Sequence, residues 1–132
     1  MSQHSRKVLE AFAQSHDPRH FSKDAVYTQI APSKSFHGRE EIAGMLRLFY
    51  EEAFSDAAGE LRNVAVDTEK NLGMIEFVFR GRHTGPLMGI APTGRSVEVP
   101  MLAVYELGEG TIDRARLYYD MATFMRQLGQ NP

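Results

Sequence analysis

The chain has 132 residues, a net charge of −2, 42% hydrophobic residues and no cysteine. These values are typical of one globular domain, speak against nucleic acid as a partner, and exclude disulfides and thiolate chemistry. No apolar run approaches the ~20 residues needed to span a bilayer, so we expect a cytoplasmic, single-domain protein over residues 1–132 that binds no membrane.

The first part of the chain has the apolar spacing of helices. Val8, Leu9 and Phe12 predict an amphipathic helix that ends near residue 16. Pro18 favours the first turn of a short second helix. The strongest helical pattern covers residues 38–54, where apolar residues recur three, four and seven positions apart.

The later part of the chain alternates with a period of two. Strands are predicted at residues 24–30, 61–66, 74–83, 97–107 and 112–119, with a loop at 31–37. Helices first and consecutive strands later favour an α+β fold with an antiparallel sheet. A strongly curved sheet wrapped around the helix at 38–54 would enclose a pocket.

Asp120 is the first candidate for chemistry, because it follows an aromatic strand. A two-residue turn at 109–110 would place Asp120 opposite Val99, and a three-residue turn would place it opposite Glu98. Either neighbour would raise the carboxyl pKa, by desolvation or by a like charge, as a general acid or base near neutral pH requires. Alternatively, Asp120 caps the helix that starts at Met121.

Three further polar residues are candidates for the site. Arg116 would be a partner of Asp120 or Glu76, a clamp for a substrate oxygen, or a solvated strand residue. Glu76 would be a pocket acid or an outward-facing residue of a half-exposed strand. His83 would transfer a proton, or it would hydrogen-bond the turn that follows it.

A ligand pocket would be lined by apolar and aromatic side chains. The candidates for this lining are Tyr27, Met45, Phe49, Phe79, Met101 and Tyr118. No metal-ligand spacing, phosphate-binding glycine loop or nucleophile elbow occurs in the sequence, so we expect neither a metal nor a cofactor.

The second half of the chain resembles a known family. The matching segments are His83–Thr84–Gly85, the Gly-Ile-Ala-Pro-Thr-Gly-Arg run at 89–95, Val97–Glu98–Val99, and Asp120 followed by Gln127–Leu128–Gly129. Their order and spacing are similar to those of the SnoaL-like polyketide cyclase family. The resemblance is carried by roughly residues 80–129, and the helix start at 38–42 is compatible with it.

The resemblance implies a cystatin-like or nuclear-transport-factor-like α+β barrel, as in ketosteroid isomerase, scytalone dehydratase and limonene epoxide hydrolase. It also implies a cofactor-free, usually oligomeric protein in which Asp120 is the acid/base of an intramolecular aldol ring closure. Three residues depart from the family: Arg116 replaces a usual tryptophan, Glu76 replaces a frequent arginine, and Tyr27 or Gln29 replaces a frequent histidine.

These observations predict a small-molecule enzyme that performs aldol-type cyclisation or isomerisation on a hydrophobic carbonyl or polyketide-like compound, with Asp120 as general acid/base. One alternative is epoxide hydrolysis by Asp120, Arg116 and a second acid, Glu76 or Glu98. The other is a non-catalytic ligand-binding domain. We also expect a homodimer built on the outer face of the sheet, because the strands at 74–83 and 97–107 carry apolar residues on both faces.

Overall fold

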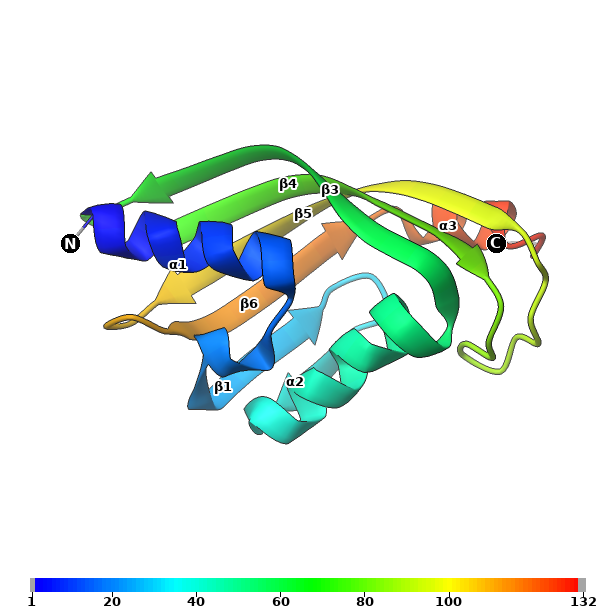
Figure 1. The fold of residues 1–132 in the computed structure, drawn as a ribbon, viewed down its shortest axis with the longest axis horizontal. Helices are drawn as coiled ribbons and strands as arrows, with labels where there is room; N and C mark the ends of the chain where they lie inside the picture. The colour runs from blue at the N-terminus through cyan, green and yellow to red at the C-terminus, as the bar shows by residue number, and fades with distance from the viewer. Residues whose placement is uncertain (1, 131–132) are drawn as a thin grey trace.

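The computed structural model describes the backbone of residues 2–130 and the side chains of residues 5–130. The helical elements are α1 (Ser2–Ser15), the 3-10 turn η1 (Pro18–His20), α2 (Gly38–Arg47), the π-helical turn η2 (Leu48–Glu52) and α3 (Met121–Gln127). The strands are β1 (Phe21–Gln29), β2 (Lys34–His37), β3 (Phe54–Asp67), β4 (Leu72–His83), β5 (Ser96–Leu107) and β6 (Ile112–Tyr119). Figure 1 shows the long strands as one layer with α1 and α2 on the same side of it.

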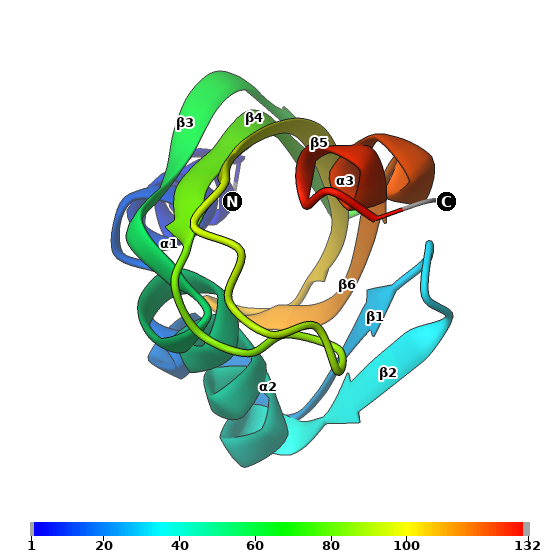
Figure 2. The ribbon, with the colours of Figure 1, turned by 90° about the vertical axis from the view of Figure 1, so that its right-hand side faces the viewer.

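The strands form a single sheet in the order β2-β1-β6-β5-β4-β3. Seen from one end, the sheet curls strongly around a central space (Figure 2). The predicted α+β fold with a curved sheet is confirmed. One pair differs from the expected antiparallel pattern, because β1 and β6 run parallel. These two strands are not joined by a turn, so no local sequence signal sets their relative direction.

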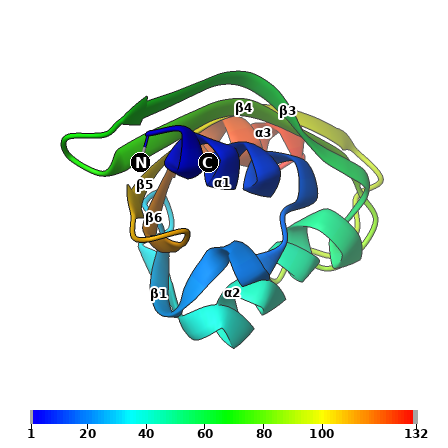
Figure 3. The same ribbon diagram turned by 60° about the vertical axis from the view of Figure 1, so that its left-hand side comes forward.

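Helices α1 and α2 lie across the concave side of the sheet (Figure 3). Leu9 and Phe12 of α1 and Ile42, Met45 and Leu46 of α2 are buried, which accounts for the helical apolar spacing of both segments. The core therefore lies between these two helices and the concave face.

The helix predicted at 38–54 is shorter than expected. α-Helical bonding ends at Arg47, and within η2 the Ala53 N–H donates to the Leu48 carbonyl at 2.7 Å, which is an i→i+5 bond. The N–H groups of Thr84 and Gly85 both donate to the Ala53 carbonyl. These bonds tie the chain to the loop after β4, so it enters β3 at Phe54 instead of continuing as a helix.

The loop predicted at 31–37 contains a short strand. β2 pairs antiparallel with β1, from Gln29 opposite Lys34 to Val26 opposite His37. Only four residues long and largely exposed, β2 lacks the apolar alternation that would reveal a strand in the sequence.

A bulge in β6 changes which side chains of that strand face the concave side of the sheet. The turn has two residues, as one predicted register requires, because the Gly108 N–H donates to the Thr111 carbonyl at 2.9 Å. Leu107 then pairs with Ile112, but the next pair is Glu106 with Arg114, which leaves Asp113 as an extra residue. The Asp113 carboxylate bends back to accept a hydrogen bond from the Thr111 hydroxyl at 2.9 Å.

Neither predicted register therefore occurs beyond the bulge. Tyr119 lies opposite Met101, and Tyr118 lies opposite Leu102. Because side chains alternate between the two faces, Leu117 and Tyr119 turn towards the concave side while Arg116 and Tyr118 turn to the convex side.

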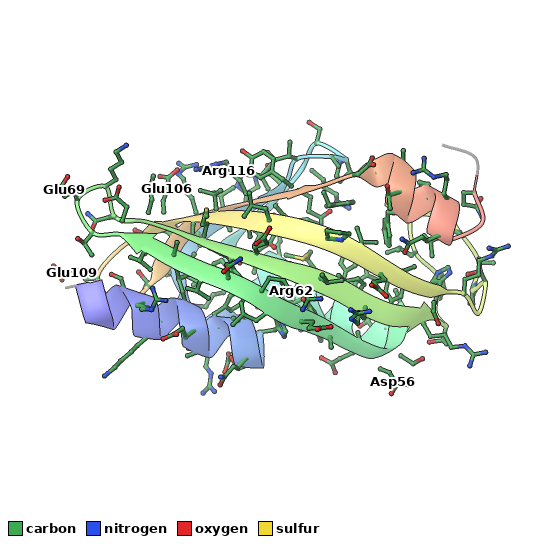
Figure 4. The ribbon with its side chains drawn as sticks, turned by 90° about the horizontal axis from the view of Figure 1, so that it is seen from above. Asp56, Arg62, Glu69, Glu106, Glu109 and Arg116 are labelled. Atoms are coloured by element: carbon green, nitrogen blue, oxygen red, sulfur yellow. The ribbon has the colours of Figure 1, made fainter. Side chains whose placement is uncertain are left out.

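The convex face carries charged side chains in rows. Arg80 bridges Glu60 and Glu98, and Arg62 also contacts Glu60. Figure 4 shows Arg116 and Glu106 near each other, on the neighbouring strands β6 and β5, and Arg62 over β3. Exposed Met74 and Tyr118 lie among the charges. The predicted dimer on this face stays a prediction. None of the helices in residues 2–130 has the length and apolar character to cross a membrane.

Candidate active site

A cavity lies on the concave face of the sheet, beneath α1 and η2. Its walls are mainly aliphatic and aromatic side chains. Five of the six residues expected in a ligand pocket line it, namely Tyr27, Met45, Phe49, Phe79 and Met101, whereas Tyr118 does not. The cavity volume is about 50 Å³, well below the ~300 Å³ of ordinary small-molecule sites. A ligand larger than a few heavy atoms must therefore displace lining side chains, and the flexible Met45 is suited to such movement.

The polar groups of the cavity are uncharged and come from separate elements. They are His16 at the end of α1, Tyr27 and Gln29 of β1, Tyr50 of η2, Tyr105 of β5 and Tyr119 of β6. None of these six side chains forms a hydrogen bond to another described residue. No aspartate, glutamate, lysine or arginine belongs to the cavity lining over residues 5–130.

Four tyrosines line this one cavity, and several of their hydroxyls are near enough to affect one another's pKa. Burial raises the pKa of Tyr27 far above its usual range, and the nearby Tyr50 and Tyr119 raise it further. Burial does the same to the pKa of Tyr105, with smaller contributions from Tyr27 and Tyr50. Burial also raises the pKa of Tyr50, and it raises the pKa of Tyr119 to about 12. All four hydroxyls therefore keep their protons at neutral pH and are hydrogen-bond donors.

His16 is held at the cavity by backbone geometry and by stacking. Its φ of 52° is left-handed, which turns the chain out of α1. The imidazole stacks on the Tyr50 ring with centroids 4.0 Å apart and planes 21° apart. Gly59 on β3 leaves room for both groups, because a Cβ there would lie 3.1 Å from the Tyr50 hydroxyl and 3.4 Å from His16 Nε2. Burial lowers the pKa of His16 to about 4, so the ring is neutral at pH 7.

The prediction that Asp120 points into an apolar cavity with a raised pKa is wrong. Asp120 is exposed at the start of α3, where its carboxylate accepts hydrogen bonds from the Ala122 N–H at 3.1 Å and the Thr123 hydroxyl at 2.7 Å. The bond from Thr123 is the main cause that lowers the pKa of Asp120. Asp120 thus has the geometry of the alternative that the sequence left open, a helix N-cap.

Arg116, Glu76 and Tyr118 also lie outside the cavity, on the convex face. Arg116 donates to a Glu106 carboxylate oxygen at 2.6 Å, and Glu76 accepts a hydrogen bond from the Asn63 amide at 2.7 Å. Tyr118 is 41% exposed. The expected pairing of Arg116 with Asp120 or Glu76 does not form, because the bulge in β6 turns Arg116 away from the concave side and Glu76 also projects from the convex face.

His83 is fully buried but does not line the cavity. Its Nδ1 accepts a hydrogen bond from the Thr93 N–H at 3.2 Å and lies 3.0 Å from the Thr93 hydroxyl. Its backbone also bonds with Gly94 and Arg95. His83 therefore holds the loop after β4, which is the alternative reading of this histidine. Among residues 5–130 there is no cluster of histidine and acidic side chains that could hold a metal ion.

Of the polar groups that meet in the cavity, Tyr27 was expected there from the sequence, whereas His16, Tyr50, Tyr105 and Tyr119 were not. Tyr105 shares the parity of Met101 on β5, so the alternation of that strand could have identified it. Tyr119 could not be identified by regular alternation along β6, because the bulge changes the face to which it points. His16 and Tyr50 lie at the ends of helical segments, where the local turn and not the periodicity decides the direction of a side chain.

Comparison with known proteins identifies relatives of the chain. The family model described as SnoaL-like polyketide cyclase matches residues 3–128. Aklanonic acid methyl ester cyclase AcmA of Streptomyces galilaeus is 29% identical over 89 residues, which are 67% of this chain and 58% of that protein. The chain thus spans little more than half the length of this relative.

Two solved structures share the fold. A candidate SnoaL-like polyketide cyclase from Jannaschia sp. CCS1 is 18% identical, with a TM-score of 0.82 over 98% of this chain and 94% of that one. TsrD from Streptomyces laurentii is 23% identical, with a TM-score of 0.75 over 97% and 94%. At these identities the likeness concerns the fold alone.

Proposed function

Because the chain belongs to the SnoaL-like polyketide cyclase family, we propose that its cavity is the active site of an enzyme that acts on an apolar carbonyl compound. The reaction is cofactor-independent acid/base chemistry. Ring closure by an aldol-type step is the reaction that we favour, and isomerisation is the second candidate. One relative is named as a cyclase of a methyl ester, in keeping with the first choice.

The observation that carries the proposal is the group of tyrosine hydroxyls without protein partners. These hydroxyls are open to the cavity, where a ligand or water can satisfy them, and a hydroxyl left without any partner would cost about 1–3 kcal/mol. Here Tyr27, Tyr50, Tyr105 and Tyr119 line the same apolar cavity from four different elements. This arrangement suits a ligand that is apolar over most of its surface and carries oxygen acceptors at one place.

The chemical role of these hydroxyls follows from their protonation. Removal of a proton next to a carbonyl places negative charge on the carbonyl oxygen. Donors that stay protonated at neutral pH stabilise this oxygen, and they do so more strongly in an apolar cavity than in water. Tyr27 and Tyr105 are the most buried of the four tyrosines and are the donors that we assign to this role.

The epoxide hydrolase alternative has no site in this arrangement. Its acid–arginine–acid set would need Arg116 beside Asp120 in the cavity, but Arg116 is bonded to Glu106 on the convex face. A ligand-binding domain without catalysis would use the same cavity, and it differs from the enzyme only in leaving the bound carbonyl compound unchanged.

The experiment uses 2-naphthol as an enol-like ligand and 2-tetralone as a carbonyl probe. We expect 2-naphthol to bind and the protein to accelerate exchange of the 2-tetralone α-protons with D₂O, followed by NMR. Gly59→Val should weaken binding and exchange at least ~10-fold, because its side chain would occupy the space beside Tyr50 and His16. Ala58→Val, at the exposed neighbouring position, is the matched control and should change neither.

Two results would overturn the proposal. Absence of 2-naphthol binding, or binding that Gly59→Val leaves unchanged, removes the cavity as the site. Binding without any acceleration of exchange favours the non-catalytic ligand-binding domain.

A further inference from the structure

We propose that His16 is the catalytic base of this cavity, and that its Nε2 takes the proton from the carbon next to the substrate carbonyl. This inference rests on the proposed function, since it names the proton acceptor of the same site. It moves the acid/base role from Asp120, which caps α3, to a histidine at the opposite end of the chain.

The composition of the cavity lining identifies His16 as the candidate base. A base must have a neutral or anionic form that can take up a proton near neutral pH. The described lining contains no carboxylate, lysine or cysteine, and protonated tyrosines and glutamine do not fill this role. His16 is therefore the group among the lining residues 5–130 whose neutral form has a nitrogen lone pair that can accept a proton.

The local geometry points the same way. Neither ring nitrogen of His16 bonds to another described residue, so one lone pair is available to a ligand. Nε2 and the Tyr50 hydroxyl both lie close to Gly59, where an added Cβ would be 3.4 Å and 3.1 Å from them. Stacking on Tyr50 and an edge-on contact with Phe12, at a centroid distance of 5.9 Å, fix the plane of the ring.

The backbone around His16 and Tyr50 departs from regular structure at both residues. Five non-glycine residues among the described ones have left-handed φ, and His16 is the one of them that lines the cavity. Tyr50 belongs to the π-helical turn η2, a second kind of irregularity that is frequent at functional sites. These two irregular segments bring the stacked pair together over Gly59.

Among residues 5–130, the charged side chains near His16 are not placed to neutralise its protonated ring, so the substrate enolate is its counterion. Tyr50 from η2 faces the ring and is neutral. The carboxylate of Asp17, which caps η1, is engaged by the Arg19 guanidinium at 2.7 Å, and the His20 ring lies on another edge of Phe12. Glu51 and Glu52 of η2 and Asp56 and Glu60 of β3 are exposed or turned outward. The imidazolium formed by proton transfer is thus stabilised mainly by the enolate oxygen within the cavity.

The step balances without a further reactant. The C–H bond breaks, its proton bonds to Nε2, and its electron pair forms the C=C bond of the enolate while the carbonyl π electrons move onto oxygen. In ring closure, the enolate carbon then forms a C–C bond with a second carbonyl of the same molecule. The resulting alkoxide takes the proton from Nε2, which returns His16 to its neutral form.

The test compares His16→Gln with His20→Gln, whose ring contacts the same Phe12 but lies outside the cavity. We expect His16→Gln to slow 2-tetralone exchange by about 10²–10⁴-fold and to keep 2-naphthol affinity within about threefold. His20→Gln should leave both unchanged. In the unmodified protein, kcat/KM for exchange should be constant above about pH 5 and fall as the pH drops through about 4, where His16 takes up a proton.

The outcomes separate this inference from the function on which it rests. Exchange at the unmodified rate in His16→Gln, with 2-naphthol still bound, overturns the assignment of the base and leaves the cavity as the site. Loss of 2-naphthol binding in the unmodified protein overturns both. If His16→Gln is unstable, long-range ¹H–¹⁵N NMR of the unmodified protein decides: 2-naphthol should shift the His16 Nε2 signal, and an unshifted signal contradicts the proposal.

Discussion

The two faces of the curved sheet differ in the kind of polar group that they carry. The convex face holds charged side chains paired with one another, such as Arg80 with Glu60 and Glu98. The polar side chains that line the cavity of the concave face are neutral throughout the described residues 5–130, and they are set among apolar side chains. Ionisable residues that look catalytic in the sequence therefore lie mostly where water and opposite charges already satisfy them.

This difference has a physical basis. Exposed ion pairs contribute little to stability, about 0–1 kcal/mol each, so the convex face tolerates charge without depending on it. A charge on the concave face would have to lose its water, which is costly unless a partner is present. Tyrosine hydroxyls and a neutral imidazole provide hydrogen-bonding and proton-accepting capacity at much lower desolvation cost.

The largest expected contrast between the faces is in packing. Phe54 is fully buried and its ring packs near those of Phe79 and Phe124. Phe54→Ala should lower the free energy of unfolding by about 3–5 kcal/mol in urea denaturation. Arg80→Met, on the convex face, should change it by less than about 1 kcal/mol. Equal losses would show that the ion pairs stabilise the fold as much as the core does.

The second contrast concerns stability against pH. The pKa of His16 falls from 6.5 to about 4 on folding, so between these values the unfolded chain binds more protons than the folded protein. The contribution of His16 to the free energy of unfolding should therefore decrease as the pH drops from about 6.5 to 4, by roughly 3 kcal/mol. Below pH 4 this contribution should stay constant, while protonation of carboxylates with a lowered pKa, such as Asp120, decreases stability further. Denaturation curves at several pH values measure it. His16→Gln should remove the His16 contribution and His20→Gln should retain it. A decrease of the same size in both variants would contradict the partly buried, neutral state of His16.

Adjacent tyrosines of β6 provide a matched pair for ligand binding. Tyr119 lines the cavity and Tyr118 is exposed on the convex face. Tyr119→Phe should weaken 2-naphthol binding by about 3–10-fold, the effect of one hydrogen bond, in a calorimetric titration. Tyr118→Phe should have no measurable effect. The reverse result would mean that the ligand binds the convex face.

The smallest expected effect concerns Asp120. Because Asp120 is a helix cap, Asp120→Asn should change the free energy of unfolding by less than about 0.5 kcal/mol. Asp120→Ala should lower it by about 1 kcal/mol. Because Asp120 lies outside the cavity, Asp120→Asn should also leave 2-tetralone exchange unchanged. A large loss of exchange in a stable Asp120→Asn protein would restore the carboxylate as the catalytic base.

The sequence allowed the fold to be predicted further than the site. Apolar periodicity identified α1, the start of α2 and the five strands β1, β3, β4, β5 and β6. β3 was identified only in part, because it begins at Phe54, within the predicted helix, and is largely exposed. The site depended on features without a periodic signal: the extra residue Asp113, the π-turn that directs Tyr50, and the left-handed His16. Because of the bulge at Asp113, Tyr119 and not the predicted Tyr118 lines the cavity. For the same reason, Arg116 lies on the convex face and not on the predicted concave one.

Methionine-methyl NMR is the most direct test of the claim that ligand binds within the concave face. Met45 and Met101 line the cavity, whereas Met74 and Met88 are 41% and 49% exposed and lie outside it. On addition of 2-naphthol to ¹³C-methyl-labelled protein, the signals of Met45 and Met101 should shift with a common dissociation constant, and those of Met74 and Met88 should not. Shifts confined to Met74 or Met88 would contradict the account.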